Sequence, residues 1–253
     1  MTLTEAKFEY LLRLGDNALI LGHRLSEWCG HGPILEQDIA ITNIALDQVG
    51  QARSLLQYAG ETEGKGRSED DLAYKRDVMA FRNVLLVEQP NEDFAYTIVR
   101  QFLFDTFNFL QFQALCKSND DHLRAIAEKS IKEITYHLRY SSEWMRRLGD
   151  GTEESHQKMQ AALDDLIIYS GELTTPDEVD QMVHEAGIAP SLAQIQPAYQ
   201  QKLQSITEEA TLKLPEVKYM QSGGKDGRMH SEYLGYILAE LQFVQRAYPN
   251  MEW

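Results

Sequence analysis

Four acidic residues and one histidine fall at spacings that could place metal ligands inside a bundle of helices. Glu133 and His137 are four residues apart, so they share one face of a helix. Glu27, Asp47 and Asp105 lie in three other segments with helical periodicity. Carboxylates and imidazoles from four helices are the ligands that hold paired iron ions in the cores of helical bundles. An oxygen-activating di-iron centre is therefore the first chemistry to consider.

The sequence lacks a histidine at both positions where such a centre requires one. A di-iron bundle takes one Glu from each of two helices and a Glu-x-x-His pair from each of two others. The corresponding residues are Glu27, Asp47 with Gly50, Asp105, and Glu133 with Tyr136. Gly50 has no ligand atom, Tyr136 offers a phenol, and His137 is rotated by about 100° from the expected position. These positions, with His137, indicate a degenerate metal site, and we predict no catalytic, cofactor-binding or metal-binding residue.

Buried carboxylates without a metal ion must be protonated or paired, because desolvating an isolated charge is unfavourable. Arg24, Arg53, Arg100 and Arg139 are candidates to supply the pairing charge. The other hypothesis is a rearranged site that uses the same carboxylates with His137, in an oxygenase or oxidase acting on its own. An oxygen-rich site with at best one imidazole suits iron poorly.

Long helices are needed to position these residues, and the helix-capping and helix-breaking residues of the sequence predict them. Thr2 and Glu5 form a capping-box pattern, and Gly60 is a candidate helix stop. The expected helices cover residues 2–29, 33–59, 68–88, 91–117, 120–148, 152–171, a short stretch after Thr175, 191–212 and 229–247. The predicted fold class is all-α, a ferritin-like bundle of long antiparallel helices with additional C-terminal helices. We expect one domain over residues 1–253.

Composition excludes several classes of function. The chain has 253 residues, 43% of them apolar, and a formal charge of −15. Such an acidic surface repels nucleic acids and anionic membranes. No apolar run approaches the roughly 20 residues of a membrane span, and the N-terminus lacks a signal-peptide pattern. Cys29 and Cys116 give no disulfide framework, so we expect a cytoplasmic chain.

Five segments, in order along most of the chain, carry a resemblance to a known family. They are LRLGDNALILGHRLSEWCGHGP at 12–33, IALDQVGQARSLLQYAG at 44–60, LLVEQPNEDFAYTIVRQFLFD at 85–105, IKEITYHLRYSSEWMRRLGDGTEESHQKMQ at 131–160 and SGGKDGRMHSEYLGYILAELQFVQR at 222–246. The sequence resembles the structural C subunits of the bacterial ring 1,2-phenylacetyl-CoA epoxidases, multicomponent monooxygenases of aerobic phenylacetate breakdown.

The resemblance implies a ferritin-like fold without a functional metal site. It places the di-iron centre and the CoA-ester site on a homologous catalytic A subunit, with which the C subunit pairs. Further subunits assist, and a reductase supplies electrons from NADPH. The chain is thus expected to be a non-catalytic, structural member of a hetero-oligomer with no cofactor of its own. A homodimer of the isolated chain stays open.

Two further features bear on partners. The loop Ser222–Arg228 carries two cations before a helix N-terminus, where a CoA phosphate could bind. It lacks a P-loop pattern, so we favour a partner-contact or surface loop. Phenylalanines at 102–112 cover more than one face of their helix, which fits either a partner helix or a bundle that wraps this helix on all sides. We expect partner contacts on the helices at 33–59 and 91–117.

Overall fold

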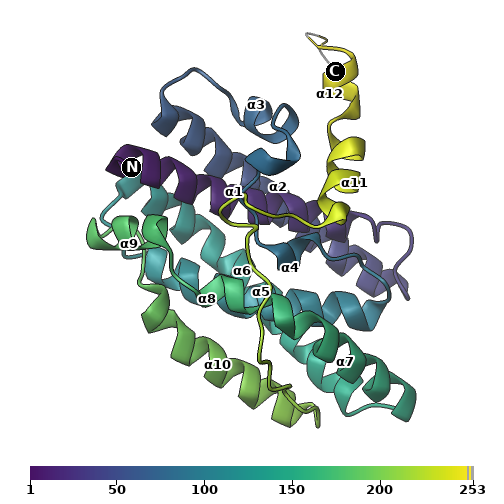
Figure 1. Ribbon diagram of the computed structural model, residues 1–253. Coiled ribbons are helices and arrows are strands. Elements are labelled where there is room, and N and C mark those ends of the chain that lie inside the picture. The colour runs from purple at the N-terminus through teal and green to yellow at the C-terminus, as the bar shows by residue number, and fades with distance from the viewer. Residues whose placement is uncertain (250, 252–253) are drawn as a thin grey trace. The chain divides into compact units, whose positions relative to one another are not determined.

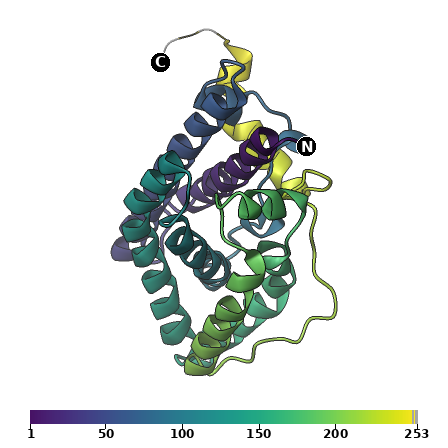
Figure 2. The same cartoon turned by 90° about the vertical axis from the view of Figure 1, so that its left-hand side faces the viewer.

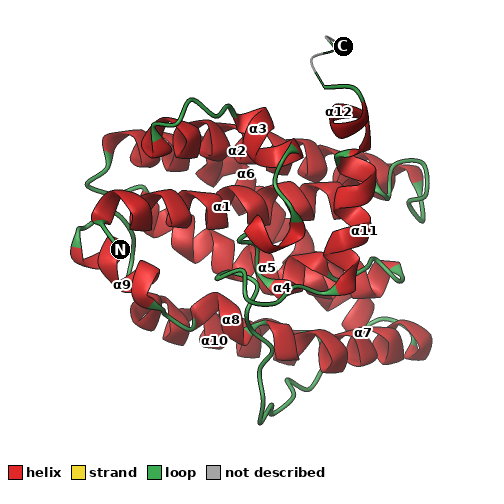
Figure 3. Cartoon of the chain, turned by 45° about the horizontal axis from the view of Figure 1, so that its top comes forward, coloured by secondary structure: helices red, strands yellow, loops and turns green. Residues whose placement is uncertain are grey.

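The computed structural model describes residues 1–249 and 251, and every regular element in that part of the chain is a helix (Figure 3). The predicted all-α class is confirmed, and the helices are consistent with a ferritin-like bundle. None of the described helices combines the length and apolar character needed to cross a bilayer. The chain divides into a first unit, Met1–Gln89 with Ser222–Trp253, and a second unit, Pro90–Gln221. The single domain over 1–253 stays a prediction.

An antiparallel pair of long helices forms the frame of the first unit. Helices α1 (Leu3–Ser26) and α2 (Leu35–Glu63) pack against each other along their lengths (Figure 1). The predicted capping box is confirmed, because Glu5 N donates to Thr2 Oγ1 at 3.2 Å and Thr2 N donates to Glu5 Oε2 at 2.7 Å. Helix α1 ends three residues before the predicted end at Cys29, since residues 27–31 form turns.

The predicted helix stop at Gly60 is wrong. Helix α2 continues through Gly60 to Glu63 and ends at Gly64, which has a left-handed backbone with φ +70°. After this end the chain folds back, and the Arg67 carbonyl oxygen lies so close to Gly60 that a Cβ there would overlap with it. Gly60 therefore permits a close approach of the following loop, whereas Gly64 performs the C-terminal capping.

The single helix predicted over 68–88 is also wrong. The structure has three short elements there, namely α3 (Glu69–Tyr74), the 3-10 helix η1 (Val78–Ala80) and α4 (Leu85–Glu88). Side chains of α1 replace the helical hydrogen bonds: Asp16 accepts from Arg82 N and Asn17 accepts from Val84 N, both at 2.8 Å. These tertiary hydrogen bonds outweigh the local helix propensity.

The C-terminal part of the first unit folds onto its N-terminal part. Two helices, α11 (Glu232–Leu241) and α12 (Phe243–Ala247), replace the one predicted over 229–247, and α11 contacts η1. The preceding loop 222–228 packs against residues 79–85, so closely that a Cβ on Gly224 would overlap with the Asn83 carbonyl oxygen. Its backbone glycines at 223 and 224 are buried. This loop is thus fitted to its own chain.

Helix α5 is the centre of the second unit. The elements are α5 (Phe94–Leu115), α6 (Asp121–Gly149), α7 (Glu153–Leu166), η2 (Ile167–Tyr169), α8 (Gly171–Thr174), α9 (Glu178–Glu185) and α10 (Leu192–Glu209). Helices α6, α7 and α10 all pack against α5. Side chains of Asp93, Asp120 and Thr152 cap α5, α6 and α7. After α10, residues 213–221 follow an extended path (Figure 2).

Two predictions in the second unit can be compared with the structure. The short helix after Thr175 is capped by Asp177, two residues later than expected. The phenylalanines of α5 favour the bundle over a partner helix, because four of the six are buried; Phe102, Phe104, Phe107 and Phe112 are at most 4% exposed, and Phe94 and Phe109 are half-buried. The Tyr199 hydroxyl of α10 also donates to the Leu103 carbonyl at 3.2 Å. The chain itself wraps this helix. That α5 contacts a partner stays a prediction.

Candidate functional site

A buried carboxylate lies between the two longest helices of the second unit. Asp105 on α5 is fully buried, as the 4-3-4-3 spacing of its apolar neighbours predicts. Gln101 Nε2 donates to Asp105 Oδ1 at 2.7 Å, and Ser141 Oγ on α6 donates to Asp105 Oδ2 at 2.9 Å. The carboxylate is thus held by two neutral donors from two helices.

Burial decides the protonation of this group. Desolvation raises the pKa of Asp105 from 3.8 to about 6, although nearby His137 and the two hydrogen bonds act in the opposite direction. His137 is itself fully buried, and it is the first of the groups that lower the pKa of the Asp105 carboxyl group. The arginines predicted to supply the pairing charge serve elsewhere: Arg100 donates to Pro90 O and Asn91 Oδ1, and Arg139 is exposed.

The other candidate positions on α6 do not join a buried donor set. Glu133 is half-buried, and Tyr136 is 45% exposed. The Tyr136 ring lies beside the rings of His137 and Tyr140, with centroid separations of 6.3 Å and 6.2 Å. The position where a di-iron bundle requires an imidazole therefore carries a phenol that faces solvent.

The candidate positions of the first unit lie at or near the surface. Glu27 was expected at a core face, but α1 ends at Ser26, and the exposed Glu27 side chain pairs with Arg24 at 2.9 Å. Asp47 is half-buried and Gly50 is exposed. The fully buried carboxylate of α1 is Asp16, whose partner is the Arg76 guanidinium. The sequence pattern could have indicated Asp16, because this residue interrupts the apolar run of residues 10–21.

These residues do not fit a di-iron centre. The described residues contain no group of three or more His, Cys, Asp or Glu side chains that could hold a metal ion. Gly50 supplies no donor atom, and the Tyr136 phenol is exposed. Of the seven degenerate positions, the structure brings Asp105 and His137 together in a buried cluster. That the chain binds no metal or cofactor stays a prediction.

A second buried cluster, in the first unit, was not predicted from the sequence. The Glu88 carboxylate accepts from Asn83 Nδ2 at 2.8 Å and from Ser231 N at 2.7 Å, and His230 Nδ1 lies 2.5 Å from it. His230 Nε2 lies 3.2 Å from the Phe81 carbonyl oxygen. The cluster fastens the C-terminal segment to the α4 region.

Comparison with known proteins identifies the family of this helical chain. The profile of a family described as "Phenylacetic acid catabolic protein" matches residues 2–253. The C subunit of the 1,2-phenylacetyl-CoA epoxidase of Escherichia coli (strain K12) is 48% identical over 244 residues, which cover 96% of this chain and 98% of the relative. The family match covers nearly the whole chain, and the chain therefore belongs to the family of phenylacetic acid catabolic proteins.

Proposed function

We propose that this chain is a non-catalytic partner subunit of a multicomponent epoxidase that acts on phenylacetyl-CoA. In this proposal a homologous A subunit holds the di-iron centre and performs the chemistry, and this chain supports its structure. The observation that carries the proposal is the chemistry of two positions: Gly50 and Tyr136 stand where a di-iron bundle needs imidazoles. The similarity to a relative named as the C subunit of an epoxidase supports the same role.

An apolar stripe on α2 supports the role of partner. Leu35, Ile39, Leu46 and Val49 repeat at intervals of four, seven and three residues, so they share one face of the helix. Their exposed fractions are 71%, 52%, 65% and 40%. Contiguous apolar surface on a helix marks a site of protein association. We assign this α2 stripe to the catalytic subunit, and a second copy of the chain would occupy it when that subunit is missing.

A charge placed in the α2 stripe tests the assignment. Leu46→Glu puts a carboxylate at the centre of the stripe, and we expect it to weaken binding of the catalytic subunit at least tenfold, because an interface core must desolvate that charge. Leu3→Glu is the matched control: Leu3 is 46% exposed and begins α1, where an acidic residue suits the helix dipole. Equal affinities of both variants, measured by isothermal titration, would remove the α2 stripe from the interface.

A second experiment addresses catalysis. In the reconstituted complex, Glu133→Gln in this chain removes the charge of a degenerate-site carboxylate while keeping its shape. Epoxidation at the wild-type rate is the expected outcome, since the reacting centre lies on the other subunit. A loss of turnover with the complex still assembled would instead favour a rearranged metal site in this chain.

A further inference from the structure

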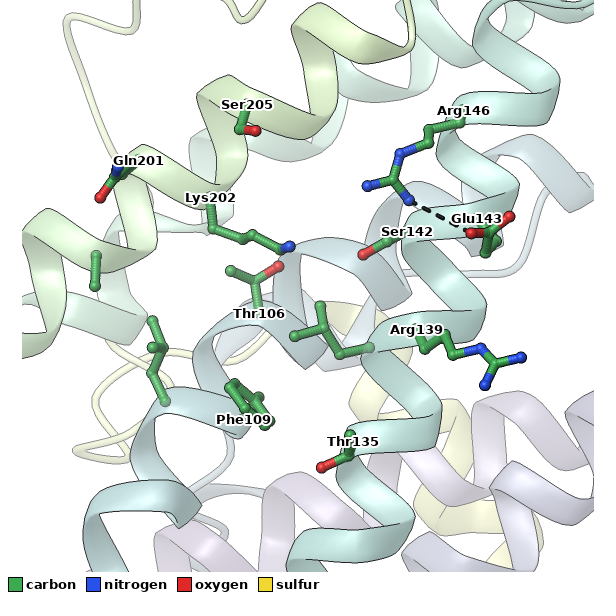
Figure 4. A pocket seen from close by; sticks show the side chains of 13 residues that line it. Thr106, Phe109, Thr135, Arg139, Ser142, Glu143, Arg146, Gln201, Lys202 and Ser205 are labelled. Carbon is green, nitrogen blue, oxygen red and sulfur yellow. Dashed lines mark ion pairs between the residues drawn. The ribbon is translucent and has the colours of Figure 1, made fainter.

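A pocket in the second unit has the features of a ligand site. Helices α5, α6 and α10 line an open pocket of about 560 Å³, and all the residues that line it belong to Pro90–Gln221 (Figure 4). This volume lies within the range of roughly 300–1,000 Å³ that is typical of small-molecule sites. The pocket is separate from the buried Asp105 cluster, since its lining includes neither Asp105 nor His137.

Positive charge collects in this pocket although the chain is acidic. Arg139, Arg146 and Lys202 line it against one carboxylate, Glu143, whereas the whole chain carries −15. Arg146 is partly neutralised, because its Nε lies 2.5 Å from Glu209 Oε2 and its Nη1 lies 3.8 Å from Glu143 Oε1. The structure shows no ion pair or hydrogen bond of Lys202 within the described residues, although its charge contributes to lowering the pKa of Glu209. Its ammonium group can therefore still contact a bound anion.

Hydrogen-bonding capacity points into the same space. Ser142 is 4% exposed, and its Oγ has no hydrogen-bond partner among the described residues. Figure 4 shows the Ser142 hydroxyl and the Lys202 ammonium directed toward the middle of the pocket, with the Arg146 guanidinium above them. A buried hydroxyl is unfavourable without a partner. An acceptor placed between these three groups would satisfy the hydroxyl and both cations.

The remainder of the lining is apolar. Phe109 and Leu110 from α5 and Leu138 from α6 contribute side chains that are half-buried. Figure 4 shows Phe109 on the side of the pocket away from Arg146. The pocket therefore offers a cationic, hydrogen-bonding part and an apolar part, which is the arrangement that recognises an amphipathic molecule.

We propose that this pocket binds a small amphipathic organic anion. A carboxylate or phosphate head group lies between Lys202, Arg146 and Ser142, and an apolar chain or ring lies against Phe109, Leu110 and Leu138. The proposal is independent of the partner role assigned above, because it rests on the lining of one pocket in the second unit.

Isothermal titration of the full chain with four probes tests the head group and the tail. Octanoate and octyl phosphate share a tail and differ in the head, inorganic phosphate lacks the tail, and octylammonium reverses the charge. We expect one site per chain for the two octyl anions, with the tighter of them identifying the head group. Inorganic phosphate is expected to bind at least tenfold more weakly, and octylammonium not at all. Binding of octylammonium as tight as that of octanoate would overturn the proposal.

Three variants locate the site. Lys202→Ala should weaken binding of the tighter octyl anion about tenfold, because one charge-assisted hydrogen bond is lost. Ser142→Ala should weaken it about threefold. Ala198→Trp fills the pocket from an exposed position on α10 and should abolish binding. Lys132→Ala is the matched control, an exposed lysine of α6 outside the lining, and should leave the affinity unchanged. Unaltered binding in both Lys202→Ala and Ala198→Trp would contradict the assignment.

Discussion

The Ser141 hydroxyl donates to the Asp105 carboxylate at 2.9 Å and thereby joins α6 to α5 inside the second unit. Ser141 and Asp105 are both fully buried, and Gln101 completes the contact from the preceding turn of α5. A polar contact of this kind is satisfied in one register of the two helices, since a shift along either axis would leave a buried group without a partner. Asp105, one of the two candidate site residues that are buried in the core, thus has a structural role.

The first prediction concerns the pH dependence of stability. The pKa of Asp105 is raised to about 6 in the folded chain, against 3.8 for an unperturbed carboxyl group. The folded state binds the Asp105 proton more tightly than the unfolded state does. Protonation of Asp105 therefore stabilises the folded state fully below about pH 4, and this contribution is lost as the pH rises through 6. The loss amounts to about 3 kcal/mol in the free energy of unfolding. Chemical denaturation between pH 4 and 7.5 measures it.

Asp105→Asn provides the control for that measurement. The amide stays neutral at every pH, and the Gln101 amide can turn over to accept from it, because Gln101 Oε1 has no hydrogen-bond partner among the described residues. The stability of the variant relative to the wild type should therefore increase from pH 4 to pH 7. A difference that stays constant over this range would show that Asp105 titrates normally.

The second prediction compares a buried ion pair with an exposed one. Arg76 and Asp16 are 5% and 0% exposed, so Arg76→Met leaves an uncompensated buried carboxylate and should cost about 3–5 kcal/mol of unfolding free energy. Arg53, paired with Glu69, is 75% exposed, and Arg53→Met should cost below about 1 kcal/mol. Denaturant titration of the two variants measures both losses; similar losses would contradict the structural role of Asp16.

The third prediction uses two glycines of the same helix. A Cβ at Gly50 meets nothing within 4 Å, so Gly50→Ala should raise the unfolding free energy by about 0.5–1 kcal/mol. At Gly60 a Cβ would overlap with the Arg67 carbonyl oxygen, so Gly60→Ala should lower it by about 1–3 kcal/mol. Thermal denaturation should show melting temperatures that move in opposite directions. Stabilisation by both substitutions would mean that the loop after α2 lies elsewhere.

The fourth prediction concerns the C-terminal segment. His230→Ala removes one contact to the buried Glu88 carboxylate, which then retains Asn83 and the Ser231 amide. Hydrogen exchange of peptides from residues 222–241 should become faster, because the contact that fastens this segment is weakened. His31→Ala, at an exposed position of the same unit, should leave those rates unchanged. Identical exchange rates in the two variants would show that His230 does not hold the C-terminal segment in place.

Local patterns predicted the parts of the fold that local interactions control. The start of α1 and the caps at Asp120 and Thr152 follow from side chains that bond to amides three residues later. The segment 68–88 could not be predicted in this way. Its hydrogen bonds go to Asp16 and Asn17, more than 60 residues earlier, and no local pattern encodes that pairing.

The candidate site was predictable to a similar extent. The burial of Asp105 followed from the apolar spacing around it, and the surface position of Glu27 did not, because it depends on α1 ending one residue before it. The role of Ser141 could not be predicted, since its contact with Asp105 depends on the register between two helices rather than on the sequence of either helix alone. The pocket at Lys202 and Ser142 requires three helices to be placed together, which periodicity does not specify.

Metal analysis tests the central claim, namely that this chain assists chemistry performed on another subunit. The chain is purified alone and again as its complex with the catalytic subunit, and iron is measured per polypeptide alongside oxygen consumption. We predict substoichiometric iron and no oxygen consumption for the chain alone, with iron in the complex accounted for by the catalytic subunit. Two transition-metal ions per isolated chain, lost together with oxygen consumption in Glu133→Ala, would contradict this account.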